Sequence, residues 1–166
     1  MIQERSDNDL RVRLELLSVA EAATLVRSVI GAVARAANLD RTLVDDLRTA
    51  VSETCNNVVL HAYPVSPGPL IFSLAIRADT VEAVVRDRGA GIRPGCIRNR
   101  GLGMGVSLIN ALADRAEFES SPASGTEVRM TFRRRLLIPE ALSHLSVGVW
   151  ALEGQRSSGA LRGRSG

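Results

Sequence analysis

Apolar and charged residues alternate in an early segment of the chain, Leu10–Leu17, where leucine or valine fills every second position from Leu10 to Leu16. A period of two places these apolar side chains on one face, so the segment is predicted to be a strand with one side against a core. Four later segments are also predicted to be strands: residues 70–77, 81–87, 116–120 and 126–133.

A helix is predicted to follow the first strand. Ser18 and Glu21 have the spacing of a capping box, in which the two residues satisfy free backbone N–H groups at the start of a helix. The residues after them are rich in Ala, Leu, Val and Ile, and the helix is expected to run to about Ala37. Asn38 interrupts this pattern, so the helix is expected to end there.

Two further helices are predicted. Asp40 is a suitable N-cap for the second helix, which covers residues 41–62. The segment 63–69 contains three prolines and is a loop by composition. The third helix covers about residues 103–114 and follows a glycine-bearing loop at 88–102.

In chain order these elements are a strand, two helices, two strands, a helix and two strands. Such grouped hairpins predict an α+β fold: a two-layer α/β sandwich with a mostly antiparallel mixed sheet that carries helices on one face. Residues 1–135 are expected to form this domain. Residues 136–166 are expected to be a tail, partly helical and then disordered, because Gly, Ser and Arg dominate its last part.

The basic residues narrow the possible functions. All 21 of them are arginine, and the 166-residue chain has a net charge of +3. The absence of lysine excludes a Walker-type phosphate loop and a lysine Schiff base, because both need a lysine. The arginines are scattered along the sequence rather than gathered into a stripe with aromatics between them, so direct nucleic-acid binding is not expected.

Cysteine usage and hydropathy indicate where the chain works. Cys55 and Cys96 lie far apart without C-x-x-C spacing, so neither a zinc site nor a disulfide framework is indicated. Cys55 is expected to pack in a helix as a small apolar residue. The first ten residues lack the apolar stretch of a signal peptide, and no run approaches the ~18 apolar residues of a membrane helix. The chain is therefore expected to be cytoplasmic, without a membrane partner.

The second predicted helix carries polar residues at a helical spacing. Glu53, Asn57 and His61 stand four residues apart and so point along one stripe. Asparagine is a poor interior helix residue because its side chain competes for backbone hydrogen bonds. A carboxylate and an amide one turn apart suit a hard cation and a proton transfer, with Asn57 as magnesium ligand and Glu53 as proton acceptor. The alternative is an ordinary solvated helix face.

A second motif is the D-x-G-x-G-I run Asp87–Ile92 at the end of a predicted strand. An aspartate there can accept a hydrogen bond from an exocyclic amine such as that of adenine. Gly89 and Gly91 let the backbone approach a flat ring without a Cβ in the way. The alternative is an ordinary turn, in which Asp and Gly are common.

A third motif, the glycine-rich run Gly101–Ile109, opens the third predicted helix. Free N–H groups at a helix start form an anion site, and glycines let a phosphate come close. A dinucleotide fingerprint is disfavoured because the preceding segment is a loop and not the first strand of a βαβ unit.

In this order and spacing, the three motifs resemble the N, G1 and G2 boxes of the GHKL ATPase superfamily, whose nucleotide pocket is called the Bergerat fold. The runs A-V-S-E-x-x-x-N-x-x-x-H-A-Y and G-M-G-x-S-L-I look like those of the small anti-sigma-factor serine/threonine kinases. The resemblance covers about residues 10–133 and implies a Bergerat ATP-binding fold, with ATP and Mg²⁺ as cofactors.

The resemblance also implies roles for single residues. Glu53 would be the catalytic base, Asn57 the magnesium ligand and Asp87 the adenine-binding residue. The further nucleotide-binding residues that it implies are Gly89, Gly91, Ile92, Gly103, Met104, Gly105 and Thr126. Thr126 would support Asp87 through a water molecule, whereas His61 is expected to pack or hydrogen-bond structurally.

The lid between Ile92 and Gly101 is short, and its Arg98 and Arg100 have two interpretations. A guanidinium here can neutralise the γ-phosphate during transfer, which makes Arg100 a catalytic candidate beside Glu53. Alternatively, both arginines are solvated charges of the lid.

The resemblance implies a kinase that phosphorylates a serine or threonine of an anti-anti-sigma partner of the STAS type. It also implies that the chain sequesters a sigma factor, with phosphorylation deciding which partner is held, and that it forms a homodimer. A competing interpretation is a non-catalytic module in which nucleotide stabilises a partner-binding surface. A third is a plain domain that binds no nucleotide.

Overall fold

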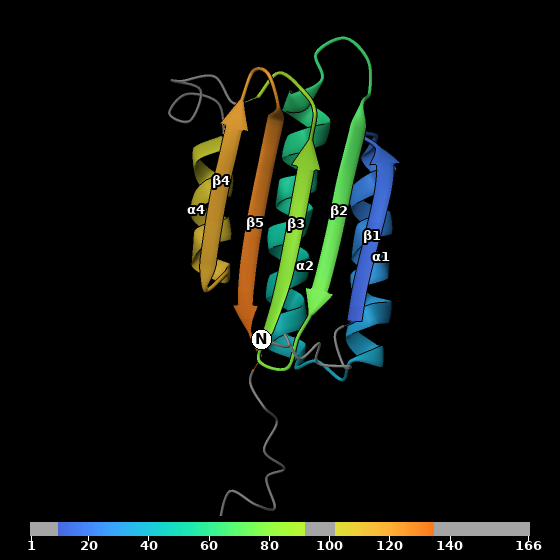
Figure 1. The fold of residues 1–166 in the computed structure, drawn as a ribbon, viewed down its shortest axis with the longest axis vertical. Coiled ribbons are helices and arrows are strands. Elements are labelled where there is room, and N and C mark those ends of the chain that lie inside the picture. The colour runs from blue at the N-terminus through green and yellow to red at the C-terminus, as the bar shows by residue number, and fades with distance from the viewer. Residues whose placement is uncertain (1–9, 92–101, 135–166) are drawn as a thin grey trace, which may run out of the picture. The chain divides into compact units, whose positions relative to one another are not determined.

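The predicted strands form a five-stranded sheet in the computed structural model, which describes residues 10–91 and 102–134. Each strand agrees with its prediction to within one residue at either end: β1 Leu10–Leu17, β2 Pro69–Ile76, β3 Thr80–Asp87, β4 Arg115–Ser121 and β5 Gly125–Arg133. The strand order is β1-β2-β3-β5-β4 (Figure 1). All four pairings of these strands are antiparallel, so this sheet is antiparallel rather than mixed.

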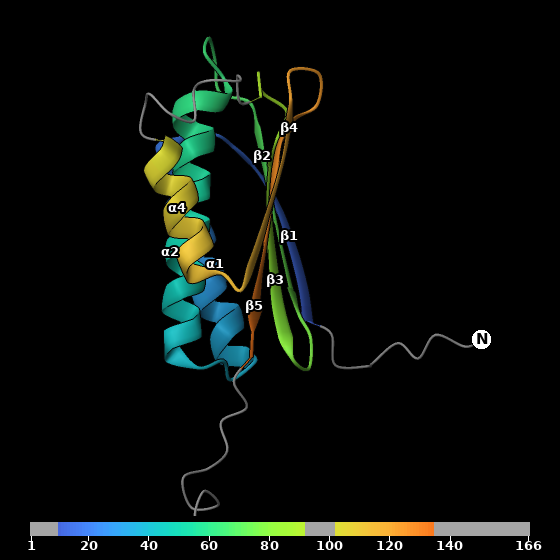
Figure 2. The ribbon, with the colours of Figure 1, turned by 90° about the vertical axis from the view of Figure 1, so that its left-hand side faces the viewer.

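The helices lie on one face of the sheet, which gives the two layers expected from the sequence (Figure 2). They are α1 Ala20–Ala36, α2 Arg41–Asn57, a π-helical turn η1 Val58–Ala62 and α4 Leu102–Leu112. No helix in the described residues is long and apolar enough to cross a bilayer. The predicted tail, residues 136–166, lies outside the described part of the chain.

The core lies between the two layers. Alternate residues of β2 and β3 point into it, among them the fully buried Leu70, Phe72 and Val85, and they pack against α1 and α2 residues such as Ile30 and Leu47. Burying side chains of this size is worth about 1.5–3 kcal/mol each. The strands are therefore held in register by the alternation that predicted them.

Cys55 packs in this core, as expected. Its side chain is fully buried, and this burial raises the pKa of its thiol from 9.0 to about 12. Cys55 is therefore a neutral, small apolar residue at neutral pH. Cys96 lies outside the described residues.

The predicted capping box of α1 is wrong. The N-cap is Val19, and no side chain caps the helix. The Ser18 hydroxyl instead accepts a hydrogen bond from Gly68 N (3.0 Å), while Ser18 N donates to Gly68 O (2.9 Å). The reason is a long-range partner: Ser18 is buried against the loop before β2, and this contact competes successfully with a local cap.

The boundary between α1 and α2 follows the prediction. Asn38 adopts a left-handed conformation (φ 50°), which asparagine tolerates better than most residues, and α1 ends before it. The Asp40 side chain then accepts a hydrogen bond from Leu43 N (3.2 Å) as the N-cap of α2.

The predicted helix over residues 41–62 is confirmed in its extent, but it changes type in its last turn. Regular α-helix ends at Asn57, and Val58–Ala62 forms a wider π turn. Two successive β-branched residues, Val58 and Val59, are crowded in an α-helix. The turn also places the Ala62 carbonyl oxygen where it accepts a hydrogen bond from Ala90 N (2.9 Å), a partner distant in sequence.

Candidate functional site

The carboxylate and the amide predicted on the second helix meet the start of α4. A Cβ built on Gly105 would lie 2.4 Å from Glu53 Oε1 and 3.2 Å from Asn57 Nδ2. The buried Gly105 backbone therefore lies against both side chains, and a larger residue there would displace at least Glu53. Residues of the first and third sequence motifs are thus in contact in the structure.

Helix α2 presents these side chains because its opposite face is apolar. Val51, Thr54 and Cys55 are buried in the core, whereas Glu53 and Asn57 are half-buried at the boundary with α4. His61 follows in the π turn and is exposed. The structure gives His61 no described contact with Glu53 or Asn57.

Asp87 ends β3 and is almost completely buried, with 2% of its surface exposed. Its Oδ1 accepts hydrogen bonds from Gly89 N (2.7 Å) and Thr126 N (3.2 Å). Burying a carboxyl group is costly unless its oxygens are hydrogen-bonded, and these two donors offset that cost. Among the described residues, none donates to Oδ2, so this oxygen remains able to accept from a ligand.

The loop after Asp87 is fitted closely to the end of the π turn. Ala90 N donates to Ala62 O, and a Cβ on Gly89 would lie only 2.1 Å from that same oxygen. The helix that carries Glu53 and Asn57 is therefore joined directly to the loop that carries Asp87. Ala62 follows Glu53 by nine residues in one continuous helical segment, which connects the two ends of the candidate site.

The β4–β5 hairpin closes the other side of this loop. Gly125 has a φ of 78°, and a Cβ on it would lie 2.4 Å from Asp87 O. Gly91 has a φ of 69° and faces Ser121 O in the same way (2.6 Å). Gly125 and Ser121 were not predicted as site residues. Gly125 could have been recognised from the sequence, because it directly precedes Thr126.

Tyr63 is a second link that the sequence analysis missed. Its hydroxyl donates to Pro69 O (2.7 Å) and accepts from Arg88 N (2.8 Å), so it joins the first residue of β2 to the residue after Asp87. Desolvation raises the pKa of the Tyr63 phenol, which keeps it protonated as a donor. A Cβ on Gly68 would lie 2.2 Å from the ring, so Gly68 leaves room for it. Tyr63 could have been recognised from the sequence, because it is the last residue of the H-A-Y run.

Thr126 lies beside Asp87, and its backbone N–H donates to Asp87 Oδ1. The support of Asp87 by the Thr126 side chain through a water molecule stays a prediction. The Thr126 hydroxyl lies 3.0 Å from the Ser120 hydroxyl. Any residue except proline could supply this N–H, so the identity of the side chain is not explained by the contact with Asp87.

Some of the predicted residues cannot be placed. Ile92, Arg98 and Arg100 lie outside the described residues. Gly103 and Met104 belong to the first turn of α4, where only the backbone is described. Within the described ranges, no group of three or more His, Cys, Asp or Glu residues could hold a metal ion.

The chain is similar to known proteins over most of its length. A family model described as histidine kinase-like ATPase domain matches residues 17–132. The chain is 32% identical over 132 residues to the anti-sigma F factor of Caldanaerobacter subterraneus subsp. tengcongensis, covering 72% of this chain and 91% of that protein. It is 34% identical to the anti-sigma F factor of Pasteuria penetrans, with coverages of 72% and 88%.

More distant proteins are also similar. The serine-protein kinase RsbW of Bacillus cereus is 25% identical over 118 residues, which are 63% of this chain and 74% of that protein. A crystal structure of RsbU and RsbW domains from Mycobacterium tuberculosis matches with a TM-score of 0.62 and 24% identity. That match covers 76% of this chain and 33% of the other, and it bears on the fold alone.

Proposed function

The chain belongs to the family of histidine kinase-like ATPase domains, and we propose that it is an ATP-dependent serine/threonine kinase that acts as an anti-sigma factor. Its family binds ATP, and its relatives include proteins named anti-sigma F factor and serine-protein kinase. On this proposal the chain phosphorylates an anti-anti-sigma protein of the STAS type and sequesters a sigma factor.

The observation that carries the proposal is the contact among Glu53, Asn57 and Gly105. A base, an amide and a glycine at a helix start meet at one point, although 48 residues separate Asn57 from Gly105. A solvated helix face would not need a glycine at the point where a second helix begins. The first turn of α4 suits phosphate oxygens, because helix N-termini favour anions.

Asp87 supports the adenine end of the same proposal. Its Oδ1 is fixed by two backbone donors, and Oδ2 has none from the described residues. A carboxyl group held in this way can accept from the exocyclic amine of adenine, which guanine lacks at the equivalent position. Adenine would therefore be selected over guanine by a single, rigid acceptor.

We assign the chemistry to the residues as follows. ATP supplies the γ-phosphoryl group, and Mg²⁺ offsets its negative charge. Glu53 accepts the proton of the partner's hydroxyl, and Asn57 provides one oxygen ligand to the magnesium ion. Arg100, outside the described residues, would neutralise charge on the γ-phosphate, with Gly103, Met104 and Gly105 around the phosphates.

The wider setting of this activity is also part of the proposal. We place the kinase in the cytoplasm, with a homodimer as the working assembly and no direct contact with nucleic acid. The nucleotide-binding domain would end near residue 135, before the tail of residues 136–166.

A labelled phosphoryl-transfer assay tests the proposal. The chain is incubated with radiolabelled ATP, magnesium and a candidate anti-anti-sigma partner, in parallel with Glu53→Gln. Label is expected on a partner serine or threonine and should fall by at least about a hundredfold in the variant, as expected for loss of a general base. Glu119→Gln, an exposed carboxylate on β4, is the matched control and should transfer normally.

Nucleotide binding without any transfer to the partner would contradict the kinase assignment. It would leave a nucleotide-dependent partner-binding module. If ATP with magnesium also failed to raise the melting temperature, ATP binding itself would be contradicted.

A further inference from the structure

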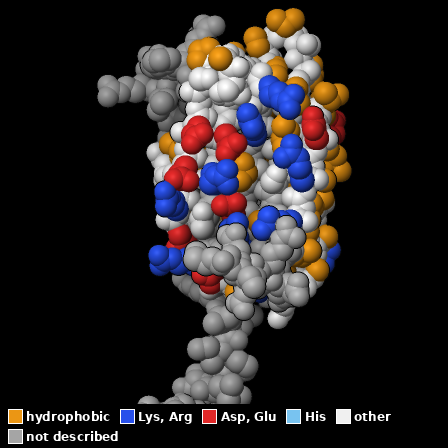
Figure 3. Space-filling view, viewed as in Figure 1, with side chains coloured by type: hydrophobic (Ala, Val, Ile, Leu, Met, Phe, Trp, Pro, Cys, Tyr) orange, Lys and Arg blue, Asp and Glu red, His pale blue; other side chains and the backbone are white. Residues whose placement is uncertain are grey.

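The face of the sheet that the helices leave uncovered is divided by charge. Figure 3 shows this face: arginine side chains predominate over β1, β2 and β3, whereas acidic side chains gather over β4 and β5. A shallow hollow of about 460 Å³ lies on it, and six arginines and two glutamates are among the residues that line the hollow. The arginines that are scattered in sequence are therefore gathered by the fold.

Strand β2, which lies between β1 and β3, forms the floor of the hollow. Its outward residues Ser73 and Ala75 are short and half-buried, and Ile71 in the same row is 5% exposed between the longer side chains of β1 and β3. The register places Ser73 opposite Arg13 on one side and opposite Val84 on the other. Strands β1 and β3 are about 9.6 Å apart across β2, which leaves a trough as wide as one extended chain or one helix.

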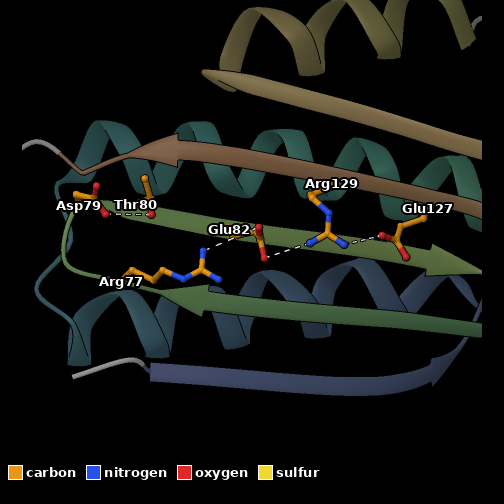
Figure 4. Close-up of polar contacts among 6 residues, drawn as sticks. All are labelled: Arg77, Asp79, Thr80, Glu82, Glu127 and Arg129. Atoms are coloured by element: carbon orange, nitrogen blue, oxygen red, sulfur yellow. Dashed lines mark hydrogen bonds and ion pairs between the residues drawn. The ribbon is translucent and has the colours of Figure 1, made fainter. Parts of the chain in front are cut away.

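Both glutamates that line this trough are already paired. Glu82 lies between Arg77 (4.0 Å) and Arg129 (3.2 Å), and the second nitrogen of Arg129 donates to Glu127 (2.8 Å) (Figure 4). In this network the charges of Arg77, Glu82, Arg129 and Glu127 offset one another, between the arginine-rich part of the face and the acidic part over β4 and β5. It leaves no acidic lining residue for the arginines farther along the trough.

Three arginines of the trough have no ion-pair partner among the described residues, although Glu15 lies in the same cross-strand row as Arg86. Arg13 on β1, Arg86 near the end of β3 and Arg88 just after it are exposed and form no ion pair with any residue of the described ranges. Guanidinium groups are planar forks that match carboxylates. Several of them around an apolar floor favour a ligand that is acidic and also carries apolar groups.

We propose that this trough, with Arg13, Arg86 and Arg88 on its walls and Ile71 in its floor, binds an acidic segment of a partner protein. Carboxylates of the segment pair with the three guanidinium groups, and its small apolar side chains lie on β2. The charge complementarity selects the acidic segment, and the floor selects a polypeptide over a bare phosphate chain.

A nucleic acid fits the trough less well. Single-stranded nucleic acids bind on aromatic side chains, and no aromatic residue is among those that line the hollow. Glu15, in the same row as Ile71 and Arg86, also places negative charge beside the track that a phosphate backbone would follow. A polypeptide can place its carboxylates so that they avoid Glu15.

The trough is separate from the phosphate end of the proposed nucleotide site. It lies on the open face of the sheet, whereas Glu53, Asn57 and Gly105 belong to the helical layer on the other side (Figure 2). An acidic partner in the trough therefore leaves Glu53, Asn57 and Gly105 uncovered. Arg88 directly follows Asp87, so the trough reaches the adenine end of the proposed nucleotide site.

The test is an NMR titration of the full chain with an eight-residue peptide of alternating Glu and Ala. Chemical-shift changes are expected along β1, β2 and β3, to weaken as salt is added, and to be absent with the matching peptide of Gln and Ala. Arg13→Gln combined with Arg86→Gln should weaken binding about tenfold, because two exposed ion pairs are lost. Arg27→Gln combined with Arg35→Gln makes the same charge change on α1 and should leave the affinity unchanged.

Three results would overturn the proposal. The first is that the peptide changes chemical shifts elsewhere on the surface, or that its affinity falls equally in the Arg13/Arg86 and the Arg27/Arg35 double variants. The second is tighter binding of an oligothymidylate to the same strands, which would make the ligand a nucleic acid. The third is self-association, seen by sedimentation, that is abolished by Arg13→Gln with Arg86→Gln, which would make the occupant a second copy of the chain.

Discussion

At the scale of single residues, the candidate site depends on two side chains whose surroundings limit what they can bind. Asp87 is buried, with one oxygen held by the backbone N–H groups of Gly89 and Thr126. Glu53 lies against Gly105 of α4, where the absence of a side chain leaves room for it. Asp87 therefore has a fixed position before any ligand arrives, which lowers the cost of binding.

Replacing Asp87 by Asn should abolish ATP binding and keep the fold. The Asn oxygen can still accept from Gly89 N and Thr126 N, but its NH₂ group would then face the adenine amine, donor against donor. We expect at least about a hundredfold loss of affinity, the effect of one buried hydrogen bond replaced by an unpaired donor. Calorimetry with ATP gives the affinity and circular dichroism the fold; normal ATP binding by the variant would refute the adenine assignment.

Replacing Gly105 by Ala should separate activity from stability. The new Cβ would lie 2.4 Å from Glu53 Oε1, and the flexible Glu53 side chain can move away from it. Alanine is a better helix residue than glycine by about 1 kcal/mol, so the melting temperature should hold or rise. Phosphoryl transfer should drop at least about tenfold because the base is displaced; transfer at the parent rate would show that Glu53 is not positioned at this contact.

At the scale of elements, the sequence predicted local structure well and long-range contacts poorly. The period-two strands, the break at Asn38 and the cap at Asp40 depend on neighbouring residues, and all of them are present. Ser18 was assigned to a capping box, but its hydroxyl bonds Gly68, fifty residues away. The π turn likewise ends in a bond to the distant Ala90, which no local pattern reveals.

The links between elements also account for how the two ends of the site are kept together. The π turn bonds the loop after Asp87 through Ala62, and Tyr63 bonds it through Arg88 N. Two short contacts therefore connect the end of the π turn to the proposed adenine end of the site. Sequence reasoning found the residues at both ends but not the connection, because hydrogen bonds to backbone groups leave little trace in side-chain identity.

Replacing Tyr63 by Phe tests this connection. The ring is kept, while Pro69 O loses a donor and Arg88 N an acceptor, at about 1 kcal/mol of stability for each bond. If the hydroxyl positions Asp87, the preference for ATP over GTP should fall about fivefold to tenfold, whereas inorganic triphosphate should bind as before. Competition binding with the three ligands measures this.

Arg134→Met is the matched control for that experiment. Arg134 also makes two bonds to backbone oxygens, of Arg77 and Ala37, but at the other end of β3. It should lose similar stability without any change in the preference for ATP. An equal loss of ATP and GTP affinity in Tyr63→Phe would reduce Tyr63 to a structural role.

At the scale of the whole molecule, one sheet carries two surfaces with different chemistry. Helices α2 and α4 carry residues of the proposed nucleotide site on the covered face, and the arginine trough lies on the open face. The motifs of the proposed nucleotide site could be recognised in the sequence because their residues are close together in three short runs. The trough could not be, because its arginines come from two strands more than seventy residues apart in sequence, and only the order β1-β2-β3 brings them together.

The most direct measurement for the central claim is an NMR titration with ATP and Mn²⁺, whose unpaired electrons broaden nearby signals. One nucleotide that spans the site should broaden the signals of Asn57 and Gly105 most strongly. It should shift those of Asp87 and Gly89 with the same dissociation constant. Signals at the two ends that saturate at different ATP concentrations, or an Asn57 signal that Mn²⁺ leaves unchanged, would contradict a single pocket.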